Sequence, residues 1–166
     1  LAELGLPANE PQVAWRNDRR WVRRHERVEL PTAGVEALPL RPQGCYLITG
    51  GLGGMGLAIA RWLASHWQAR LLVTSRSAVP PREAWDDWLR SHPADDRLSA
   101  AIVALREIES AGGAVCVAQA DAADEAAMTR ALSEGRSRFG ELHGVIHAAG
   151  VSGQRALALR GTSGAA

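Results

Sequence analysis

The sequence predicts an α/β fold with a doubly wound parallel sheet, preceded by a small β segment. Four short apolar segments of β-favouring type alternate with segments in which apolar residues recur every three or four positions. A glycine-rich run, residues 49–56, lies between the first of these strands and the first helix. Residues 1–40 lack this alternation and have an extended character instead.

Residues 1–40 predict a β-hairpin followed by a linker. Residues 12–15 and 20–23 flank Asn17-Asp18, which is a favourable turn pair. Recurring prolines make residues 30–40 an extended linker.

The hairpin region is rich in arginine. Six arginines lie between Arg16 and Arg27, with Trp15 and Trp21 beside them. Such a cluster could bind nucleic acid, but arginine runs more often face solvent or protect edge strands, and no recognition motif accompanies them. We therefore expect no nucleic-acid binding.

The glycine run predicts a phosphate site. A strand at residues 45–48 precedes it, and a helix follows whose apolar face includes Leu57 and Leu63. Five glycines at such a junction allow a tight turn, positive φ angles and close approach to main-chain atoms, so a merely flexible loop is disfavoured. A helix start attracts anions, which favours a pyrophosphate. The expected contacts are Thr49, Gly50, Gly51, Leu52, Gly53, Gly54, Met55 and Gly56.

A second strand, residues 70–74, ends at Ser75-Arg76 and leads into an insertion. Trp85, Trp88 and Leu89 share one helical face of this insertion. The two tryptophans could form a platform for a sugar or base, but packing of an extra helix against the core is favoured.

The remaining elements complete the alternation. A helix is expected from about Ser99 to Gly112-Gly113, then a strand at residues 115–118. Asp124 is expected to cap the next helix, and residues 142–147 form the fourth strand, in which His147 is interpreted as a packed histidine rather than a catalytic base. This order predicts a Rossmann-like sheet.

The strand ends predict which nucleotide binds. An NAD site carries a carboxylate after the second strand, whereas this chain has Ser75-Arg76 there. A guanidinium binds a 2′-phosphate that a carboxylate would repel, so we expect NADPH rather than NADH, although Arg76 could be an ordinary surface arginine. Asp121 can accept a bond from the adenine amino group or cap the next turn. The other expected contacts are Ala122 beside it and Ala148, Ala149 and Gly150 at the ribose.

Composition excludes several classes of protein. The net charge is +1, and no run of 18 apolar residues and no signal-peptide pattern occurs, which favours a cytoplasmic protein without membrane association. Cys45 and Cys116 fall in predicted strands and are expected to be buried free thiols, and no metal site is predicted.

Several separated motifs resemble one family. Residues 49–56 also fit T-G-x-x-x-G-x-G, and with Ser75-Arg76, Ala120-Asp121 and residues 145–150 they resemble the ketoreductase domain of modular polyketide synthases, in the short-chain dehydrogenase/reductase superfamily. Residues 10–16 are similar to the end of the structural subdomain that precedes the catalytic one.

The resemblance implies hydride transfer from NADPH to a β-ketoacyl chain on an acyl carrier protein, within a synthase that supplies the other domains. It also implies a catalytic serine, tyrosine and lysine. The chain contains no lysine, and its single tyrosine, Tyr46, lies in the first strand, so we expect no catalytic residues in it. After Gly150, where many relatives have Leu-Asp-Asp, the chain has Val151-Ser152-Gly153-Gln154, which leaves the alcohol's configuration open.

These features divide the chain into three expected parts. Residues 1–40 are the end of the structural subdomain with a linker, residues 41–155 are the NADPH-binding half of the ketoreductase, and residues 156–166 are a flexible tail. The alternative function is a non-catalytic structural or docking module of such a synthase. A free-standing reductase is disfavoured by the long segment before the first strand.

Overall fold

The computed structural model describes residues 12–29 and 38–150. Its contacts divide the chain into two units, Leu1–Leu38 and Pro39–Ala166. The first unit is an antiparallel hairpin of β1 (Val13–Arg16) and β2 (Arg19–Val22). Residues 30–37 of the expected linker and residues 151–166, which include the expected tail, lie outside the described residues.

The hairpin turn confirms the prediction made from Asn17-Asp18. Asn17 has φ 48° and Asp18 has φ 58°. Two consecutive positive φ angles are typical of a type I′ turn, whose twist matches that of the flanking strands. Asparagine and aspartate tolerate this conformation better than most residues.

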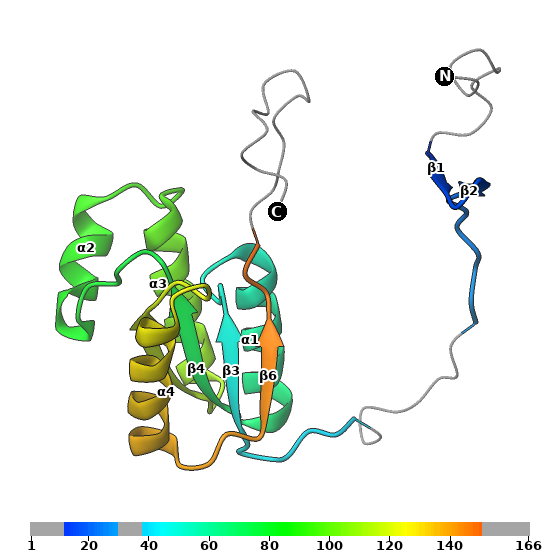
Figure 1. Cartoon of the computed structure of the whole chain (residues 1–166). Coiled ribbons are helices and arrows are strands. Elements are labelled where there is room, and N and C mark those ends of the chain that lie inside the picture. Colours follow the sequence, from blue (N-terminus) through cyan, green and yellow to red (C-terminus); the bar gives the residue numbers. More distant parts are fainter. Residues whose placement is uncertain (1–11, 30–37, 151–166) are drawn as a thin grey trace. The chain divides into compact units, whose positions relative to one another are not determined.

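The second unit contains a parallel sheet of four strands (Figure 1). The spatial order is β5-β4-β3-β6, and every neighbouring pair is parallel. This confirms the predicted fold class. The strands are β3 (Cys45–Thr49), β4 (Arg70–Ser75), β5 (Ala114–Gln119) and β6 (Gly144–His147).

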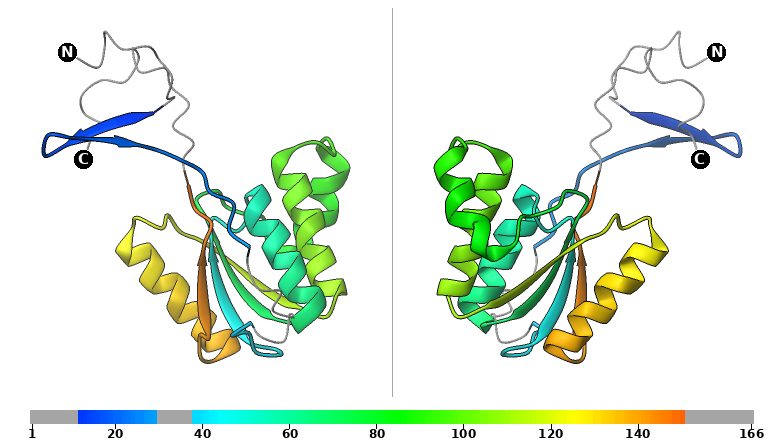
Figure 2. Two further views of the ribbon diagram at one scale, coloured as in Figure 1. Left: turned by 90° about the vertical axis from the view of Figure 1, so that its right-hand side faces the viewer. Right: turned by 90° about the vertical axis from the view of Figure 1, so that its left-hand side faces the viewer.

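Helices cover both faces of the sheet, as a doubly wound fold requires (Figure 2). Helices α1 (Gly54–Trp67), α2 (Trp85–Ser91) and α3 (Arg97–Ser110) lie on one face, and α4 (Glu125–Phe139) lies on the other. A short 3-10 turn, η3 (Arg82–Ala84), precedes α2. Among the described residues, none of these helices has the length and apolar character needed to span a membrane.

Two apolar layers hold the helices to the sheet. Because side chains alternate along a strand, Ile48 and Val73 pack with α1 and α3, whereas Leu47 and Leu72 pack with α4. Trp85 is 5% exposed and belongs to the first layer, with Trp88 and Leu89 packed against it. This confirms the core-packing interpretation of the insertion.

Both cysteines are buried and free, as predicted. Burial raises the pKa of the Cys45 thiol, and burial is also the main reason that the pKa of Cys116 is raised. The two thiols therefore stay protonated and behave as small apolar side chains.

Most element boundaries agree with the expectation to within one residue, and two differ by about two residues. Helix α3 begins at Arg97 rather than near Ser99, because Asp96 caps it and accepts hydrogen bonds from the N–H groups of Leu98 and Ser99, both at 3.0 Å. Strand β6 begins at Gly144, two residues later than expected. The cap that Asp124 was expected to provide for α4 is confirmed, since its side chain accepts from the N–H of Ala127.

The Asp96 cap predicts a pH-dependent stability. The hydrogen bonds from the N–H of Ser99 and then of Leu98 hold the pKa of the Asp96 carboxyl below its ordinary value. A carboxyl with a lowered folded pKa stabilises the fold above its unfolded pKa of about 3.9, and this contribution is lost as the pH falls through the folded value. Asparagine can cap but cannot titrate. Asp96→Asn should therefore lower the urea midpoint at about pH 7, and its difference from the wild type should shrink as the pH falls below about 4. A difference that stays constant over this pH range would contradict the assignment.

Candidate functional site

The carboxyl ends of the four strands meet at one edge of the sheet (Figure 1). The register pairs Thr49 of β3 with Thr74 of β4 and with His147 of β6, and Ser75 of β4 with Gln119 of β5. Ligands of open α/β sheets bind outside this edge. The fold therefore brings the sequence-predicted residues 49–56, 75–76, 121–122 and 148–150 to the same edge.

Three glycines of the run are required by the packing of the chain itself. Gly50 has φ 63°, and a Cβ there would lie 2.6 Å from the Cα of Ala149. A Cβ on Gly51 would lie 2.6 Å from Cγ1 of Val73, and one on Gly56 would lie 2.5 Å from the Cα of Gly51. These contacts are too short for any side chain, so the three glycines let the turn, α1 and β4 approach one another.

The other two glycines are less crowded, and Gly54 faces open space. A Cβ on Gly54 would meet nothing within 4 Å, and one on Gly53 would meet only the carbonyl oxygen of Gly50, at 3.2 Å. Helix α1 begins at Gly54 without a side-chain cap and without an acidic residue in its first turn. The first N–H groups of a helix lack intrahelical partners and attract anions. This open, uncapped end is therefore shaped for a phosphate group. Beside it, Met55 is 72% exposed and Leu52 is buried.

A hydrogen bond links the ends of the two central strands. Oγ1 of Thr49 lies 2.7 Å from Nδ1 of His147, and the N–H of Ala148 donates to the Thr49 carbonyl at 3.1 Å. His147 lies in the strand, but it is exposed rather than packed as expected, because α4 packs mainly against β4 and β5. The main-chain bond from Ala148 accompanies a close approach of Ala148 and Ala149 to Gly50.

Arg76 follows β4 directly and is exposed. Within residues 12–29 and 38–150 its guanidinium makes no ion pair. Its main chain, in contrast, is held: the Gln119 side chain donates to the Arg76 carbonyl at 3.1 Å. Ser75 Oγ accepts from the N–H of Ser77 at 3.2 Å. Sequence reasoning found Ser75 and Arg76 but missed Gln119, since nothing local marks its partner 43 residues away.

Asp121 takes the capping role that was one of its two expected roles. Its Oδ1 accepts from the N–H of Ala123 at 3.0 Å, and its carbonyl accepts from the N–H of Asp124 at 3.0 Å. Both Asp121 and Ala122 are exposed. The carboxylate therefore shapes the turn after β5 and remains accessible from solvent.

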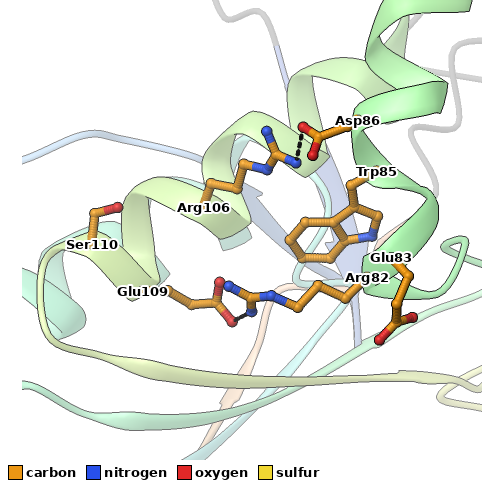
Figure 3. A pocket seen from close by; sticks show the side chains of 7 residues that line it. All are labelled: Arg82, Glu83, Trp85, Asp86, Arg106, Glu109 and Ser110. Carbon is orange, nitrogen blue, oxygen red and sulfur yellow. Dashed lines mark hydrogen bonds and ion pairs between the residues drawn. The ribbon is translucent and has the colours of Figure 1, made fainter.

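A pocket of about 570 Å³ lies between η3, α2 and α3 (Figure 3). The Arg106 side chain pairs with Asp86 at 2.7 Å, and Arg82 pairs with Glu109. Both guanidinium carbons lie near the Trp85 ring, 5.9 and 5.4 Å from its centroid. These charges neutralise one another, and none of the lining residues comes from the strand ends or the glycine turn. No group of metal-ligating side chains occurs in the described part of the chain.

A family profile described as KR domain matches residues 44–163. The chain belongs to the ketoreductase (KR) domain family. This confirms the resemblance inferred from the strand-end motifs.

The relatives of this KR chain are polyketide synthases. It is 33% identical over 150 residues to the polyketide synthase PksM of Bacillus subtilis, which is 90% of the chain and 3% of that synthase. It is 40% identical over 125 residues to 6-methylsalicylic acid synthase of Penicillium patulum, which is 74% of the chain and 7% of that synthase. The chain thus spans a small part of the curated relatives it matches.

Solved ketoreductase structures share the fold. A ketoreductase domain from the bacillaene assembly line has a TM-score of 0.58 and 29% identity, over 87% of this chain and 30% of that one. PlmKR1, from the first module of phoslactomycin biosynthesis in Streptomyces sp. HK803, has a TM-score of 0.57 and 30% identity, over 86% and 29% of the two chains.

Membership of the KR family implies a nicotinamide cofactor. The residues present fit such a nucleotide. The open surface at Gly54 and the uncapped start of α1 suit its pyrophosphate, and the small residues 148–150 leave room beside the turn. At the end of the neighbouring strand lies Arg76, a cation without an ion pair in the described part of the chain.

Proposed function

We propose that the chain is the NADPH-binding part of a polyketide synthase ketoreductase. The observation that carries the proposal is the exposed Arg76 at the end of β4, the strand beside the glycine turn, with no carboxylate in its place. A guanidinium can make two charge-assisted hydrogen bonds to the 2′-phosphate that distinguishes NADPH from NADH.

Each strand end has a proposed role. Gly54 and Met55, at the start of α1, present N–H groups to the pyrophosphate, while Gly50, Gly51 and Gly56 allow the turn to form. The N–H of Gly53 is used within the turn, where it donates to the Gly50 carbonyl at 2.9 Å, so Gly53 contributes close approach rather than a donor. Further proposed contacts are Ser75 and Arg76 at the 2′-phosphate, Asp121 and Ala122 at the adenine, Ala148, Ala149 and Gly150 at the ribose, and Thr49 and Leu52 within the glycine-rich run.

The proposed reaction reduces a β-ketoacyl thioester on an acyl carrier protein. NADPH supplies a hydride to the β-carbonyl carbon and a proton goes to its oxygen, which gives a β-hydroxyacyl thioester and NADP⁺. This chain lacks two of the three residues that the family uses for this step. It has no lysine, and its single tyrosine, Tyr46, has a part-buried hydroxyl that accepts a hydrogen bond from the N–H of Arg41 at 2.6 Å. We therefore assign cofactor binding, and no catalytic step, to these residues.

The hairpin supports a place in a larger protein. A two-stranded hairpin is marginally stable by itself. Trp15 is 55% and Trp21 is 57% exposed, although tryptophan is usually well buried. We propose that β1 and β2 end a structural subdomain, and that other domains of the synthase are the partners of this chain.

The test is a change of nucleotide preference. Arg76→Asp should weaken NADPH binding by about ten- to a hundredfold, since it removes charge-assisted bonds worth about 1.5 to 3 kcal/mol and adds repulsion. NADH binding should change little. Dissociation constants for both nucleotides can be measured by the change in nicotinamide fluorescence on binding.

Arg130→Asp is the matched control. Arg130 is exposed on α4, away from the strand ends, and has no ion pair among the described residues. Arg130→Asp therefore changes the net charge by the same amount as Arg76→Asp. An unchanged NADPH preference in Arg76→Asp would refute the phosphate assignment. Failure of the wild-type chain to bind either nucleotide would favour the alternative, a structural or docking module.

A further inference from the structure

One peptide group after β4 is held at both of its polar atoms. The peptide between Arg76 and Ser77 has its carbonyl bonded to Nε2 of Gln119 at 3.1 Å and its N–H bonded to Oγ of Ser75 at 3.2 Å. Both partners are side chains, from β5 and β4 respectively. This peptide determines the direction in which the main chain leaves Arg76.

The two bonds lie just beyond the regular sheet. The last register pair of β4 and β5 is Ser75 with Gln119, and the N–H of Ala120 donates to the Ser75 carbonyl at 2.9 Å. Arg76 is the first residue past this ladder, where a loop is normally mobile and its polar groups bind water. The hydrogen bond from Gln119 therefore fixes the main chain one residue beyond the sheet, at Arg76.

We propose that Gln119 is a positioning residue that sets nucleotide specificity by fixing the main chain of Arg76. The proposal rests on the proposed function, since it requires Arg76 to meet a 2′-phosphate. A guanidinium on a fixed main chain loses less conformational freedom when it binds, so more of its interaction energy remains as affinity. Gln119 acts only through Arg76, and it should therefore affect the binding of nucleotides that carry a 2′-phosphate, such as NADPH, and not that of NADH.

The size of the effect follows from the exposure of the site. Gln119 and Arg76 are both exposed, so water can replace the amide when it is removed. The loss of one such hydrogen bond corresponds to a change of about two- to tenfold in a dissociation constant. This is smaller than the effect of removing Arg76 itself.

A double-mutant cycle tests the coupling. Gln119→Met keeps the length of the side chain but removes the donor. In the 166-residue chain it should weaken NADPH binding by about two- to tenfold and leave NADH binding unchanged. Added to Arg76→Ala, it should have no further effect on NADPH. Equal weakening of both nucleotides, or the same weakening in the Arg76→Ala background, would overturn the proposal, because either result shows a general structural role.

Amide hydrogen exchange provides a readout without nucleotide. If Gln119 fixes this peptide, Gln119→Met should speed exchange of the Ser77 N–H in NMR spectra, as should Ser75→Ala, while the Leu71 and Val73 amides inside the sheet remain slow. Unchanged Ser77 exchange would overturn the fixing of the peptide. A different outcome separates the two proposals. If Ser77 exchange is faster but Arg76→Ala binds both nucleotides like the wild type, Arg76 does not bind the phosphate, and Gln119 then has no role in specificity.

Discussion

Replacement of Gly56 by alanine is expected to prevent the sheet-and-helix unit from folding stably. The added Cβ would lie 2.5 Å from the Cα of Gly51 and 2.9 Å from the carbonyl oxygen of Gly50. Both are main-chain atoms, so no side chain can rotate away to relieve the contact. The free energy of unfolding should fall by more than about 3 kcal/mol, which is the upper end of the usual range for overpacked sites. Circular dichroism and urea unfolding measure this loss directly.

Gly54→Ala is the matched control, because a Cβ there meets nothing within 4 Å. Alanine is also favoured over glycine inside a helix by about 1 kcal/mol, so this variant should be at least as stable as the wild type. Its methyl group would occupy the open surface at the start of α1, where the phosphate is proposed to bind. We expect NADPH binding to weaken about tenfold or more. Wild-type affinity in Gly54→Ala would show that no ligand approaches this glycine.

The second large effect is expected from Leu72→Ala. Leu72 is 1% exposed, and the other buried side chains of the α4 layer are Leu47, Cys116 and four alanines, while the larger side chains around them are only partly buried. Neighbouring alanines cannot extend into a vacated volume, so a cavity should remain. The expected loss is about 2 to 5 kcal/mol in the free energy of unfolding. Val103→Ala, at a side chain that is 43% exposed, should cost far less in the same urea measurement.

A glycine on α4 explains how this layer packs and provides a sharper test. A Cβ on Gly135 would lie 2.6 Å from Cδ2 of Leu72. Gly135→Ala alone should therefore destabilise the chain, although alanine favours helices over glycine. In the Leu72→Ala background the same change should stabilise it, because the new methyl group enters the vacated space. The same sign in both backgrounds would contradict the contact.

Local patterns were sufficient to predict the elements of the second unit. The apolar period of Leu57, Ala60, Leu63 and Ala64 determines that α1 is a helix with one buried face, and these four residues are buried in the structure. The turn pair Asn17-Asp18 likewise predicted the hairpin. Such signals depend on neighbours in sequence, so they need no tertiary information.

The boundary of α3 shows where local reasoning was incomplete. The apolar period predicted its core residues but not its start, which depends on the Asp96 carboxylate. An aspartate before a helix is a local signal and could have been used. The exposure of His147, in contrast, could not be predicted from its sequence neighbours, because it depends on which strands α4 covers.

The sequence by itself determined the order of strands and helices, the glycine-rich turn and the arginine that follows the second strand. Hydrophobic period and turn chemistry act over a few residues, so they are written in the local sequence. Only the tertiary structure decided that Gly50, Gly51 and Gly56 serve packing while Gly54 faces open space. The same holds for the bond from Gln119 to Arg76, since parallel strands bring together residues that a whole crossover separates.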